Sequence, residues 1–409
     1  MNQQNQSPSR NPIKMNMHTP SLLDRVVEEF KIQFNRTPLV LAQAPGRINL
    51  IGEHTDYNEG LVLPGAIDRN TIFALGFSPD AQICEVHALD MGEMIRFDIG
   101  DLNKMQTEGW GLYILGVVAA LQQADYEVRG FQAVFASSVP LGSGVSSSAA
   151  LECSLLMACR ELFDLDIEPF EIAKLGQWAE HHYPGVLCGL MDQFSSVMGR
   201  KDQLVCLDCR DLSYQYIDFP LPDYRFVLLN SNVKHSLSSS EYNVRKRECQ
   251  EAVQLISQAE GENFPSLREI TMAQLEKHQR ILSRKQYLRA HHVITENARV
   301  MQMMQELVRG NEEMIGSLMF ASHYSLRDAY EVSCPELDFL VMQAENHPGV
   351  LGSRMMGGGF GGCTINLVEV DRIADFISQT TEAYLESYGI QLTPITVKLA
   401  DGAGIISFP

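Results

Sequence analysis

Residues 139–152 read VPLGSGVSSSAALE, and two glycines and four serines separate an apolar run from a segment with helical periodicity. Glycine lets a backbone approach a ligand closely, and a helix that begins at such a loop presents free N–H groups and the positive end of its dipole. The stretch therefore predicts a strand, a phosphate-binding loop and a helix. The loop comprises Gly142, Ser143, Gly144, Val145, Ser146, Ser147 and Ser148. It is not a Walker A motif, because the GK[ST] ending is absent. A flexible linker is the alternative, which the ordered segments on both sides disfavour.

Upstream of this loop the sequence predicts a helix capped by Ser21 and then a series of strands. The expected strands are residues 39–45, 71–79, 82–89, 94–99 and 131–135, with a buried helix over residues 110–123 before the last. Downstream, helices follow the loop, residues 226–230 form a strand and residues 240–345 are mostly helical. Strands return over residues 364–370, 394–400 and 405–408. Because strands and helices do not alternate regularly, we expect α+β layers and no doubly wound parallel sheet.

Composition limits the classes of function that the chain can have. Its 409 residues carry a net charge of −19, which argues against binding to nucleic acid or to an anionic membrane. Nine cysteines without a disulfide framework fit a cytoplasmic protein, and the pair Cys206 and Cys209 is expected to be two thiols on a strand. No segment has the length of a membrane helix, and the N-terminus lacks the apolar core of a secretory signal. We expect residues 1–20 to be a disordered tail.

A second polar stretch, residues 44–60 (APGRINLIGEHTDYNEG), concentrates hydrogen-bonding side chains in a few positions. Glu53 and Asp56 can each accept from sugar hydroxyls, and His54 can donate or accept. Arg47 is always charged and can neutralise a phosphoryl group during transfer. Taken alone, a polar surface turn explains the stretch equally well.

A third stretch, residues 188–199 (CGLMDQFSSVMG), places Asp192 at the expected start of a short helix. The helix dipole there favours the charged carboxylate, although a helix-capping aspartate explains the residue as well. Glu180 lies near the end of the preceding helix, where a solvated helix face is the plain interpretation. The glycine run at residues 355–363 (MMGGGFGGC) indicates either a tight turn or a contact with phosphate.

In this order and spacing the stretches resemble the motifs of the GHMP kinases, and within them those of the galactokinases. Residues 46–60 resemble the galactokinase signature, residues 141–151 the ATP loop, and residues 356–363 the third motif. Residues 230–249 also read like the corresponding galactokinase segment. The resemblance runs from about residue 21 to the C-terminus. It departs from the usual pattern at Val145, where leucine is usual, and at Met356, where threonine is usual.

The resemblance implies the GHMP kinase fold, in which two domains of mixed sheets and helices enclose the active site in the cleft between them. We expect an N-terminal domain over residues 21–219 and a C-terminal domain over residues 220–409. The implied substrates are galactose and ATP, with Mg²⁺ as cofactor. The implied reaction moves the γ-phosphate to the anomeric C1 hydroxyl, the first committed step of galactose catabolism. We expect a monomer that binds neither nucleic acid nor membranes.

Roles for individual residues also follow from the resemblance. The implied catalytic pair is Asp192 as base and Arg47 as the group that stabilises the transition state. The implied sugar-binding residues are Glu53, His54, Thr55, Asp56, Gly189 and Tyr242. The implied nucleotide contacts are residues 142–148, and the implied magnesium ligands are Ser148 and Glu180. Two alternatives stay open: a kinase of a related sugar such as N-acetylgalactosamine or arabinose, and a catalytically silent galactose sensor.

Overall fold

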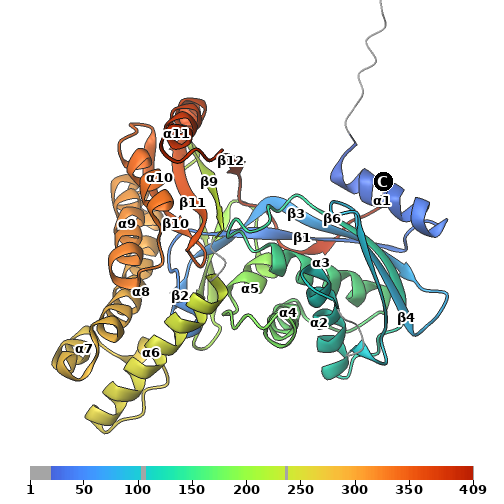
Figure 1. Ribbon diagram of the computed structural model, residues 1–409, viewed down its shortest axis with the longest axis horizontal. Coiled ribbons are helices and arrows are strands. Elements are labelled where there is room, and N and C mark those ends of the chain that lie inside the picture. Colours follow the sequence, from blue (N-terminus) through green and yellow to red (C-terminus); the bar gives the residue numbers. More distant parts are fainter. Residues whose placement is uncertain (1–19, 103–106, 235–237, 409) are drawn as a thin grey trace, which may run out of the picture.

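The computed structural model describes residues 20–102, 107–234 and 238–408 (Figure 1). Within those residues the strands form one six-stranded, one four-stranded and one three-stranded sheet. Mixed sheets with helices are what the sequence predicts, and the α+β class is confirmed. The tail expected over residues 1–20 lies, except for residue 20, outside the described residues. Among the helices of the described residues, none is both long and apolar enough to cross a membrane.

The largest sheet arises from the apolar runs of the N-terminal half and from one strand of the C-terminus. Its strands are β1 (Val40–Asn49), β3 (Pro64–Phe77), β4 (Ile83–Ala88), β5 (Glu93–Asp98), β6 (Phe131–Ser137) and β13 (Gly404–Ile405). They follow one another in the order β13-β1-β3-β6-β4-β5. Neighbours are antiparallel except for the parallel pair β4 and β6.

Helices cover both faces of this sheet (Figure 1). They are α1 (Leu22–Phe34), α2 (Trp110–Gln123), α3 (Ser147–Leu162) and α4 (Pro169–His182). Alternate residues of β3 separate the two faces: Ile72 packs in the cluster under α1, and Phe73 packs in the cluster of α2, α3 and α4. The predicted cap of α1 is confirmed, since Ser21 Oγ accepts from the Asp24 backbone N–H at 3.2 Å. The predicted bounds of α2 are also confirmed, and the helix is buried along most of its length.

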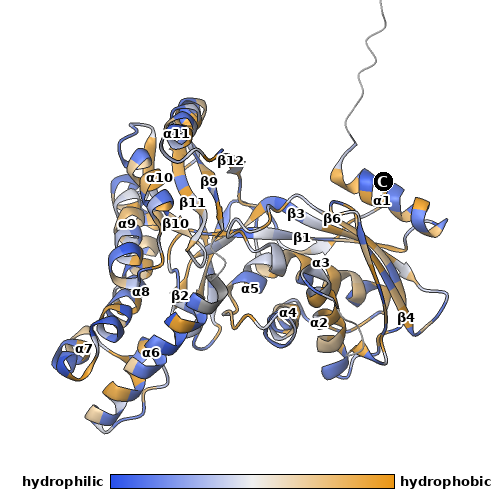
Figure 2. Ribbon diagram, viewed as in Figure 1, coloured by the Kyte–Doolittle hydropathy of each residue, from blue (hydrophilic) through white to orange (hydrophobic). Residues whose placement is uncertain are grey.

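The C-terminal half builds a second sheet with its own helices. Its strands are β9 (Tyr224–Lys234), β10 (Val350–Met356), β11 (Gly361–Glu369) and β12 (Thr393–Val397), in the order β10-β11-β9-β12. The helices are α6 (Ser238–Glu260), α7 (Met272–Lys277), α8 (Arg284–Arg309), α9 (Glu312–Ser325), α10 (Pro335–Glu345) and α11 (Ile373–Tyr388). The helical region predicted over residues 240–345 is confirmed. Figure 2 shows α6, α7 and α8 in alternating blue and orange, the pattern of amphipathic helices, while α2 is largely hydrophobic.

A short third sheet and a short helix lie between these two bodies. The sheet consists of β2 (Leu61–Val62), β7 (Gln203–Asp208) and β8 (Tyr214–Asp218), and the helix is α5 (Met191–Met198). The predicted strand around Cys206 is β7, but Cys209, which was expected on the same strand, lies just after its end. All nine cysteines lie in the described residues, and all are free thiols.

The two halves of the chain share a hydrophobic core and one strand crosses between them. The shared core includes Ile48 of β1, Leu228 of β9 and Ile365 of β11. At the C-terminus, Ile405 of β13 pairs with Ala42 of β1, so the last strand extends the N-terminal sheet. The division into residues 21–219 and 220–409 stays a prediction, and β13 is a segment that lies across it. The strand is also shorter than the sequence pattern over residues 405–408 indicates.

Candidate active site

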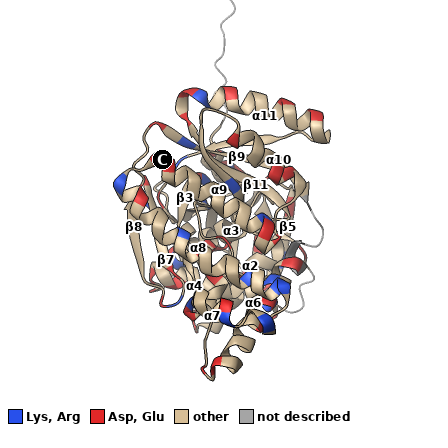
Figure 3. Cartoon of the chain, turned by 90° about the vertical axis from the view of Figure 1, so that its left-hand side faces the viewer, with Lys and Arg blue, Asp and Glu red and all other residues tan. Residues whose placement is uncertain are grey.

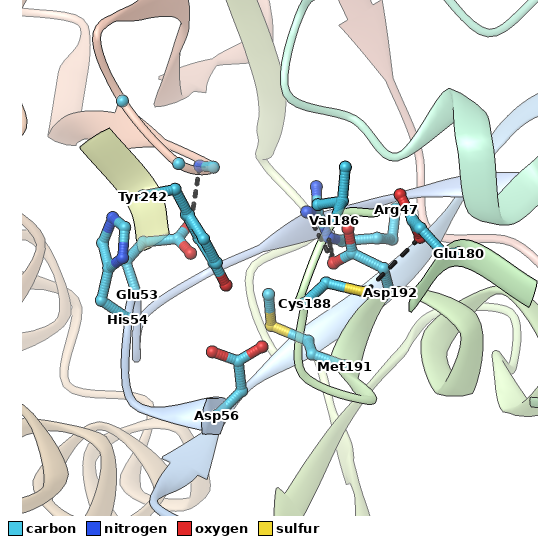
Figure 4. A pocket seen from close by; sticks show the side chains of 13 residues that line it. Arg47, Glu53, His54, Asp56, Glu180, Val186, Cys188, Met191, Asp192 and Tyr242 are labelled. Carbon is cyan, nitrogen blue, oxygen red and sulfur yellow. Dashed lines mark hydrogen bonds and ion pairs between the residues drawn. The ribbon is translucent and has the colours of Figure 1, made fainter. Parts of the chain in front are cut away.

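A cleft of about 290 Å³ gathers residues from both halves of the chain (Figure 4). Its lining comprises Arg47, Glu53, His54, Asp56, Glu180, Val186, Cys188, Met191, Asp192, Tyr242, Gly357, Gly358 and Gly359. Figure 4 shows Glu53, His54, Asp56 and Tyr242 on one side and Arg47, Asp192 and Glu180 on the other. The structure therefore brings seven of the predicted site residues into one cavity, from segments that lie far apart in the sequence.

The predicted phosphate loop ends where α3 begins. Gly142, Gly144 and Ser146 have φ values of 68°, 73° and 57°, in the left-handed region that turns the chain sharply into the helix. No side chain caps the helix at Ser146, and the Ser146 hydroxyl is buried without a hydrogen-bond partner. The N–H groups of the first turn have no partner within the helix. The start of α3 thus offers unpaired donors to an anion.

Two of the loop residues face inward instead. Ser143 is fully buried, and its hydroxyl donates to the Pro140 carbonyl at 2.8 Å. Val145 is buried in the core that joins the two halves. The side chains of these two residues therefore hold the loop in place, and the serines at 147 and 148 are the half-buried ones.

The glycine run at residues 355–363 packs directly on the phosphate loop. A Cβ at Gly144 would lie 3.0 Å from the Met356 carbonyl oxygen, and a Cβ at Gly357 would lie 3.1 Å from the Gly144 Cα. Gly357 and Gly359 have φ values of 83° and 81°. The run is thus a tight turn whose backbone approaches the other loop and lines the cleft. The buried Met356 side chain, which departs from the family pattern, packs in the shared core.

Arg47 of β1 and Asp192 of α5 form an ion pair at the middle of the cleft. Asp192 Oδ1 accepts from Arg47 Nε at 2.8 Å and from Nη2 at 2.7 Å. A third donor, Arg47 Nη1, bonds to the Gly144 carbonyl, so one guanidinium connects the carboxylate to the phosphate loop. Although burial lowers it, the pKa of Arg47 is raised by the nearby carboxylates of Asp192, Glu53 and Asp56. Leu190 is the cap of α5, so Asp192 is not a helix-capping aspartate.

Glu53 is held from the C-terminal half. Its Oε1 accepts from the Gly357 backbone N–H at 2.8 Å and from Arg354 Nη2 at 3.1 Å. Arg354 is fully buried and also donates to the carbonyls of Asn49, Leu50 and Met355. With Oε1 occupied, Oε2 is the carboxylate oxygen left for a ligand in the cleft.

His54 enters the cleft as a neutral imidazole. Burial and the charges of His292 and Arg245 lower its pKa to about 3. Its Nδ1 lies 2.8 Å from the Tyr57 hydroxyl, which lies 2.8 Å from the Tyr330 hydroxyl, while its Nε2 is buried without a partner. A ligand hydroxyl can satisfy that free ring nitrogen.

Asp56 lies opposite the ion pair, and Gly189 makes the room for it. A Cβ at Gly189 would overlap the Asp56 carboxylate. Burial and the charge of Asp192 raise the pKa of Asp56 to about 7. Tyr242 of α6 lies against the same turn, with ring centroids 5.5 Å from His54 and 5.1 Å from Tyr57.

Two predicted sugar-binding residues, Gly189 and Thr55, are not among the residues that line the cleft. Gly189 packs against Asp56, as described above, and Thr55 faces the interior. Thr55 is fully buried, and its hydroxyl donates to the carbonyls of Gly52 at 2.8 Å and Leu61 at 2.7 Å. Its geometry shapes the turn that carries its neighbours, and its role as a sugar contact stays a prediction.

Ser148 contacts Glu180, which lines the cleft, but neither Ser148 nor any other residue of the predicted loop 142–148 is among the lining residues. Burial and the charge of Asp192 raise the pKa of Glu180 to about 7, while hydrogen bonds from Ser148, Cys188 and Gln193 partly offset that rise. Among the described residues no cluster of three or more histidine, cysteine, aspartate or glutamate side chains has the geometry of a metal site. The Ser148 hydroxyl and the Glu180 carboxylate still form a set of oxygen ligands. The negative charges of Glu180 and Asp192 repel each other, which favours a bound cation.

Three features of the site had no separate signal in the sequence. Arg354 lies in the segment before the glycine run and gave no indication that it holds Glu53. Cys188 and Met191 line the cleft from the stretch that was singled out for Asp192. Their residue types near Asp192 do not tell a side chain that lines a cleft from one that packs in the core.

The comparisons with known proteins agree with this geometry. Family models match for the galactokinase galactose-binding signature over residues 28–77, the GHMP kinases N terminal domain over residues 113–200 and the GHMP kinases C terminal over residues 303–383. The galactokinase of Thermotoga petrophila is 42% identical over 361 residues, which cover 88% of this chain and 98% of that protein. This chain belongs to the galactokinase family. The galactokinase of Canis lupus familiaris is 39% identical over 391 residues, covering 94% of this chain and 97% of that protein.

Solved structures show that the chain also shares the fold of this family. The Lactococcus lactis galactokinase complexed with galactose is 34% identical, with a TM-score of 0.89 over 94% of this chain and 100% of that chain. The Methanococcus jannaschii mevalonate kinase, at 15% identity and a TM-score of 0.64, shares the fold alone. The predicted GHMP kinase fold and galactokinase family are confirmed. As a member of that family, the chain is a sugar kinase that uses ATP.

Proposed function

We propose that this galactokinase-family chain transfers the γ-phosphate of ATP to the anomeric C1 hydroxyl of galactose and forms galactose 1-phosphate and ADP. The observation that carries the proposal is the Arg47–Asp192 pair, which lies between the start of α3 and the turn of Glu53, His54 and Asp56. The groups suited to phosphate and the groups suited to a sugar therefore lie on two sides of the Asp192 carboxylate. The galactose bound in the Lactococcus lactis relative supports the choice of sugar.

The sugar end of the cleft supplies hydrogen-bond acceptors that suit hydroxyls. Glu53 Oε2, the Asp56 carboxylate and His54 Nε2 are available, and Tyr242 adds an aromatic wall. An epimer with one misplaced hydroxyl would leave one of these buried groups unpaired, and that penalty discriminates strongly between substrates. Glu53 and His54 are held rigidly by groups behind them, so the site does not adapt to the wrong sugar. We therefore propose a strong preference for galactose over glucose.

In the proposed reaction, the C1 oxygen forms a bond to the γ-phosphorus, and the bond from that phosphorus to the bridging oxygen of ADP breaks. Asp192 accepts the proton of the C1 hydroxyl. Arg47 pairs with Asp192 and directs positive charge toward the phosphate loop through its bond to Gly144. Phosphoryl transfer is loose, so orienting the two substrates, worth about 7–11 kcal/mol, outweighs a general base, worth about 10²–10⁴-fold.

The phosphate end of the cleft fits Mg²⁺, and we propose that Ser148 and Glu180 would hold it. The fit rests on the donor set, because the Ser148 hydroxyl and the Glu180 carboxylate lie in hydrogen-bond contact and supply the oxygen ligands that Mg²⁺ prefers. Bound there with ATP, the ion neutralises charge on the phosphates. The protein's own part is to place an anion-binding helix start and one carboxylate on opposite sides of the phosphates.

We also propose that the chain works as a monomer in the cytoplasm without nucleic-acid or membrane partners. Nine free thiols suit a reducing compartment. On the face shown in Figure 3, acidic and basic residues are interspersed over the helices, and the chain as a whole carries a net charge of −19. Such mixed charge gives no field that attracts polyanions.

The decisive experiment incubates the protein with ATP, Mg²⁺ and galactose labelled with ¹³C at C1. Release of ADP measures turnover, and the ³¹P spectrum of the product identifies the bond. We expect the phosphorus signal to be split by the labelled carbon. N-acetylgalactosamine, arabinose and glucose serve as competing acceptors. A product without the splitting, or equal kcat/KM for galactose and glucose, contradicts the proposal, and sugar binding without ADP release identifies a sensor.

A further inference from the structure

Three helices meet directly behind the phosphate end of the cleft, and each contributes one buried polar side chain. Glu152 lies on α3, Glu180 on α4 and Gln193 on α5. Glu152 and Gln193 are fully buried, and Glu180 is 5% exposed. Ser148 and Glu152 are four residues apart on α3, so they share one face of that helix. Galactokinase chemistry as described above uses Ser148 and Glu180 but gives no role to Glu152 or Gln193.

The Gln193 amide connects the two carboxyl groups. Its Nε2 donates to Glu180 Oε2 at 2.6 Å and to Glu152 Oε2 at 3.0 Å. An amide nitrogen has two N–H donors, so both are occupied by these carboxyl oxygens. Cys188 Sγ also lies 3.5 Å from Glu180 Oε2. Glu180 Oε2 thus contacts the fully buried Gln193 and also Cys188, which lines the cleft.

From this arrangement we propose that Glu152 and Gln193 are positioning residues that orient the Glu180 carboxylate toward the metal–nucleotide end of the cleft. The proposal rests on the role proposed above for Glu180. Gln193 fixes the orientation of Glu180, and Glu152 fixes the orientation of Gln193 by accepting its second N–H. Since Glu152 and Ser148 lie on the same helix, these hydrogen bonds link the position of Glu180 to the end of the phosphate loop, where α3 begins.

Packing leaves this group little freedom to rearrange. A Cβ at Gly176 of α4 would lie 3.0 Å from Gln193 Cγ and 3.5 Å from Glu152 Oε2, so a side chain there would press on both. The remaining oxygens, Glu152 Oε1 and Gln193 Oε1, are buried without partners. Burial raises the pKa of Glu152 well above its usual range, and the neighbouring charge of Glu180 adds to that rise. A buried carboxyl group with an unpaired oxygen lowers the stability of the fold. Such a cost is expected where the orientation of a side chain serves function.

Orientation of a metal-binding carboxylate by a hydrogen-bonded neighbour has a known size of effect. Removing such a partner typically lowers metal affinity about 10–100-fold. The side chains at the sugar end of the cleft are held by other groups, including Arg354 and Tyr57, and not by the hydrogen bonds among Glu152, Gln193 and Glu180. A loss confined to metal and nucleotide therefore separates positioning of Glu180 from a general weakening of the fold.

The experiment measures Mn²⁺ affinity in the presence of ADP by the loss of the free-ion electron paramagnetic resonance signal, beside the KM values for galactose and Mg²⁺. The variants are Gln193→Met, which keeps the length but removes both donors, and Glu152→Gln, which keeps an acceptor oxygen. We expect Gln193→Met to weaken Mn²⁺ binding about 10–100-fold and Glu152→Gln to stay within about twofold. The galactose KM stays unchanged in both. Glu152→Met, which releases the amide, is the second test if Gln193→Met does not fold.

Glu180→Gln separates this inference from the proposed function beneath it. If Glu180→Gln weakens Mn²⁺ binding and Gln193→Met and Glu152→Met leave it unchanged, the positioning chain is refuted while the role of Glu180 stands. If Glu180→Gln itself leaves Mn²⁺ binding unchanged, the proposed metal role fails first and the inference fails with it. Equal losses of metal affinity and galactose affinity in Gln193→Met also contradict the inference.

Discussion

Replacing Asp192 by asparagine tests the proposed chemistry with the smallest change of shape. The carboxylate accepts from Arg47 Nε and Nη2 through one oxygen, Oδ1. An asparagine Oδ1 can keep one of these hydrogen bonds, whereas the negative charge and the ability to take a proton are lost. The Asp192 side chain is 23% exposed, so water can compensate part of the lost charge beside Arg47. The variant should therefore fold with its cleft intact.

The size of the expected loss follows from the role assigned to the carboxylate. A general base contributes about 10²–10⁴-fold, which corresponds to about 2.7–5.4 kcal/mol at about 1.36 kcal/mol for each factor of ten. Glu53 is fixed by Arg354 and the start of α3 by its own backbone, so these two groups keep their places when that charge is removed. We expect kcat to fall within that range and the dissociation constants of galactose and ADP to change less than about threefold.

The assay compares steady-state ADP release with equilibrium binding of galactose and Mg-ADP by calorimetry. Asp125→Asn is the matched control, because Asp125 is exposed and its φ of 60° is one that asparagine tolerates. The control should keep kcat and both affinities. A kcat for Asp192→Asn within about threefold of the unsubstituted chain removes Asp192 from the role of base. A loss of galactose binding as large as the loss of kcat would instead assign Asp192 to substrate binding.

Three further predictions concern the same cleft. Arg47→Lys keeps the charge but loses the fork that joins Asp192 to Gly144, so kcat should fall about 10²–10³-fold in the ADP-release assay with little change in galactose affinity. Gly189→Ala should raise the galactose KM and leave the ATP KM unchanged, because the methyl group displaces the Asp56 carboxylate. Burial raises the pKa of Asp56 from 3.8 to about 7, so the native state keeps a proton that the unfolded chain loses. The free energy of unfolding should then fall as pH rises from about 4 to about 7, by up to about 4 kcal/mol from this group, and Asp56→Asn should reduce that slope in urea titrations. If Asp56→Asn left the pH dependence of the free energy of unfolding unchanged, the assignment of that dependence to Asp56 would be refuted.

Local signals made several elements of the fold predictable. The helix over residues 110–123 has the predicted bounds because an apolar segment of that length, without proline or charge, has no competing structure. Ser21 caps α1 because the hydroxyl and the following acidic residue satisfy the first N–H groups locally. Asp192 was expected at the start of a short helix, and it lies in the first turn of α5. In each case the determining contacts lie within one or two turns of chain.

The parts that were not predictable depend on contacts across the whole sequence. Arg354 and Glu53 are 301 residues apart, and the alignment of their side chains follows only from the packing of β10, which carries Arg354, against the turn after β1 that carries Glu53. The pairing of β13 with β1 joins the C-terminus to the first strand, and two residues of strand carry too little periodicity to reveal a partner. The motif also gave no sign that the Thr55 hydroxyl bonds to carbonyls of its own turn, while its sugar contact stays a prediction. Motif membership identifies a residue's neighbourhood and not the direction of its side chain.

The charge balance of the cleft is also a property of the assembled site and of no single motif. Asp56 comes from the turn after β1, Glu180 from α4 and Asp192 from α5, and the charge of Asp192 helps to raise the pKa values of the other two. Arg47 is the guanidinium that lines this cavity, and its donors are already directed to Asp192 and Gly144. Asp56 and Glu180 keep pKa values near 7, although the charge of Arg47 lowers that of Asp56. A site of this kind is stabilised by ligands that bring hydroxyl donors to Asp56 and positive charge to Glu180, which are the chemical features of a sugar and of a nucleotide that carries a divalent cation.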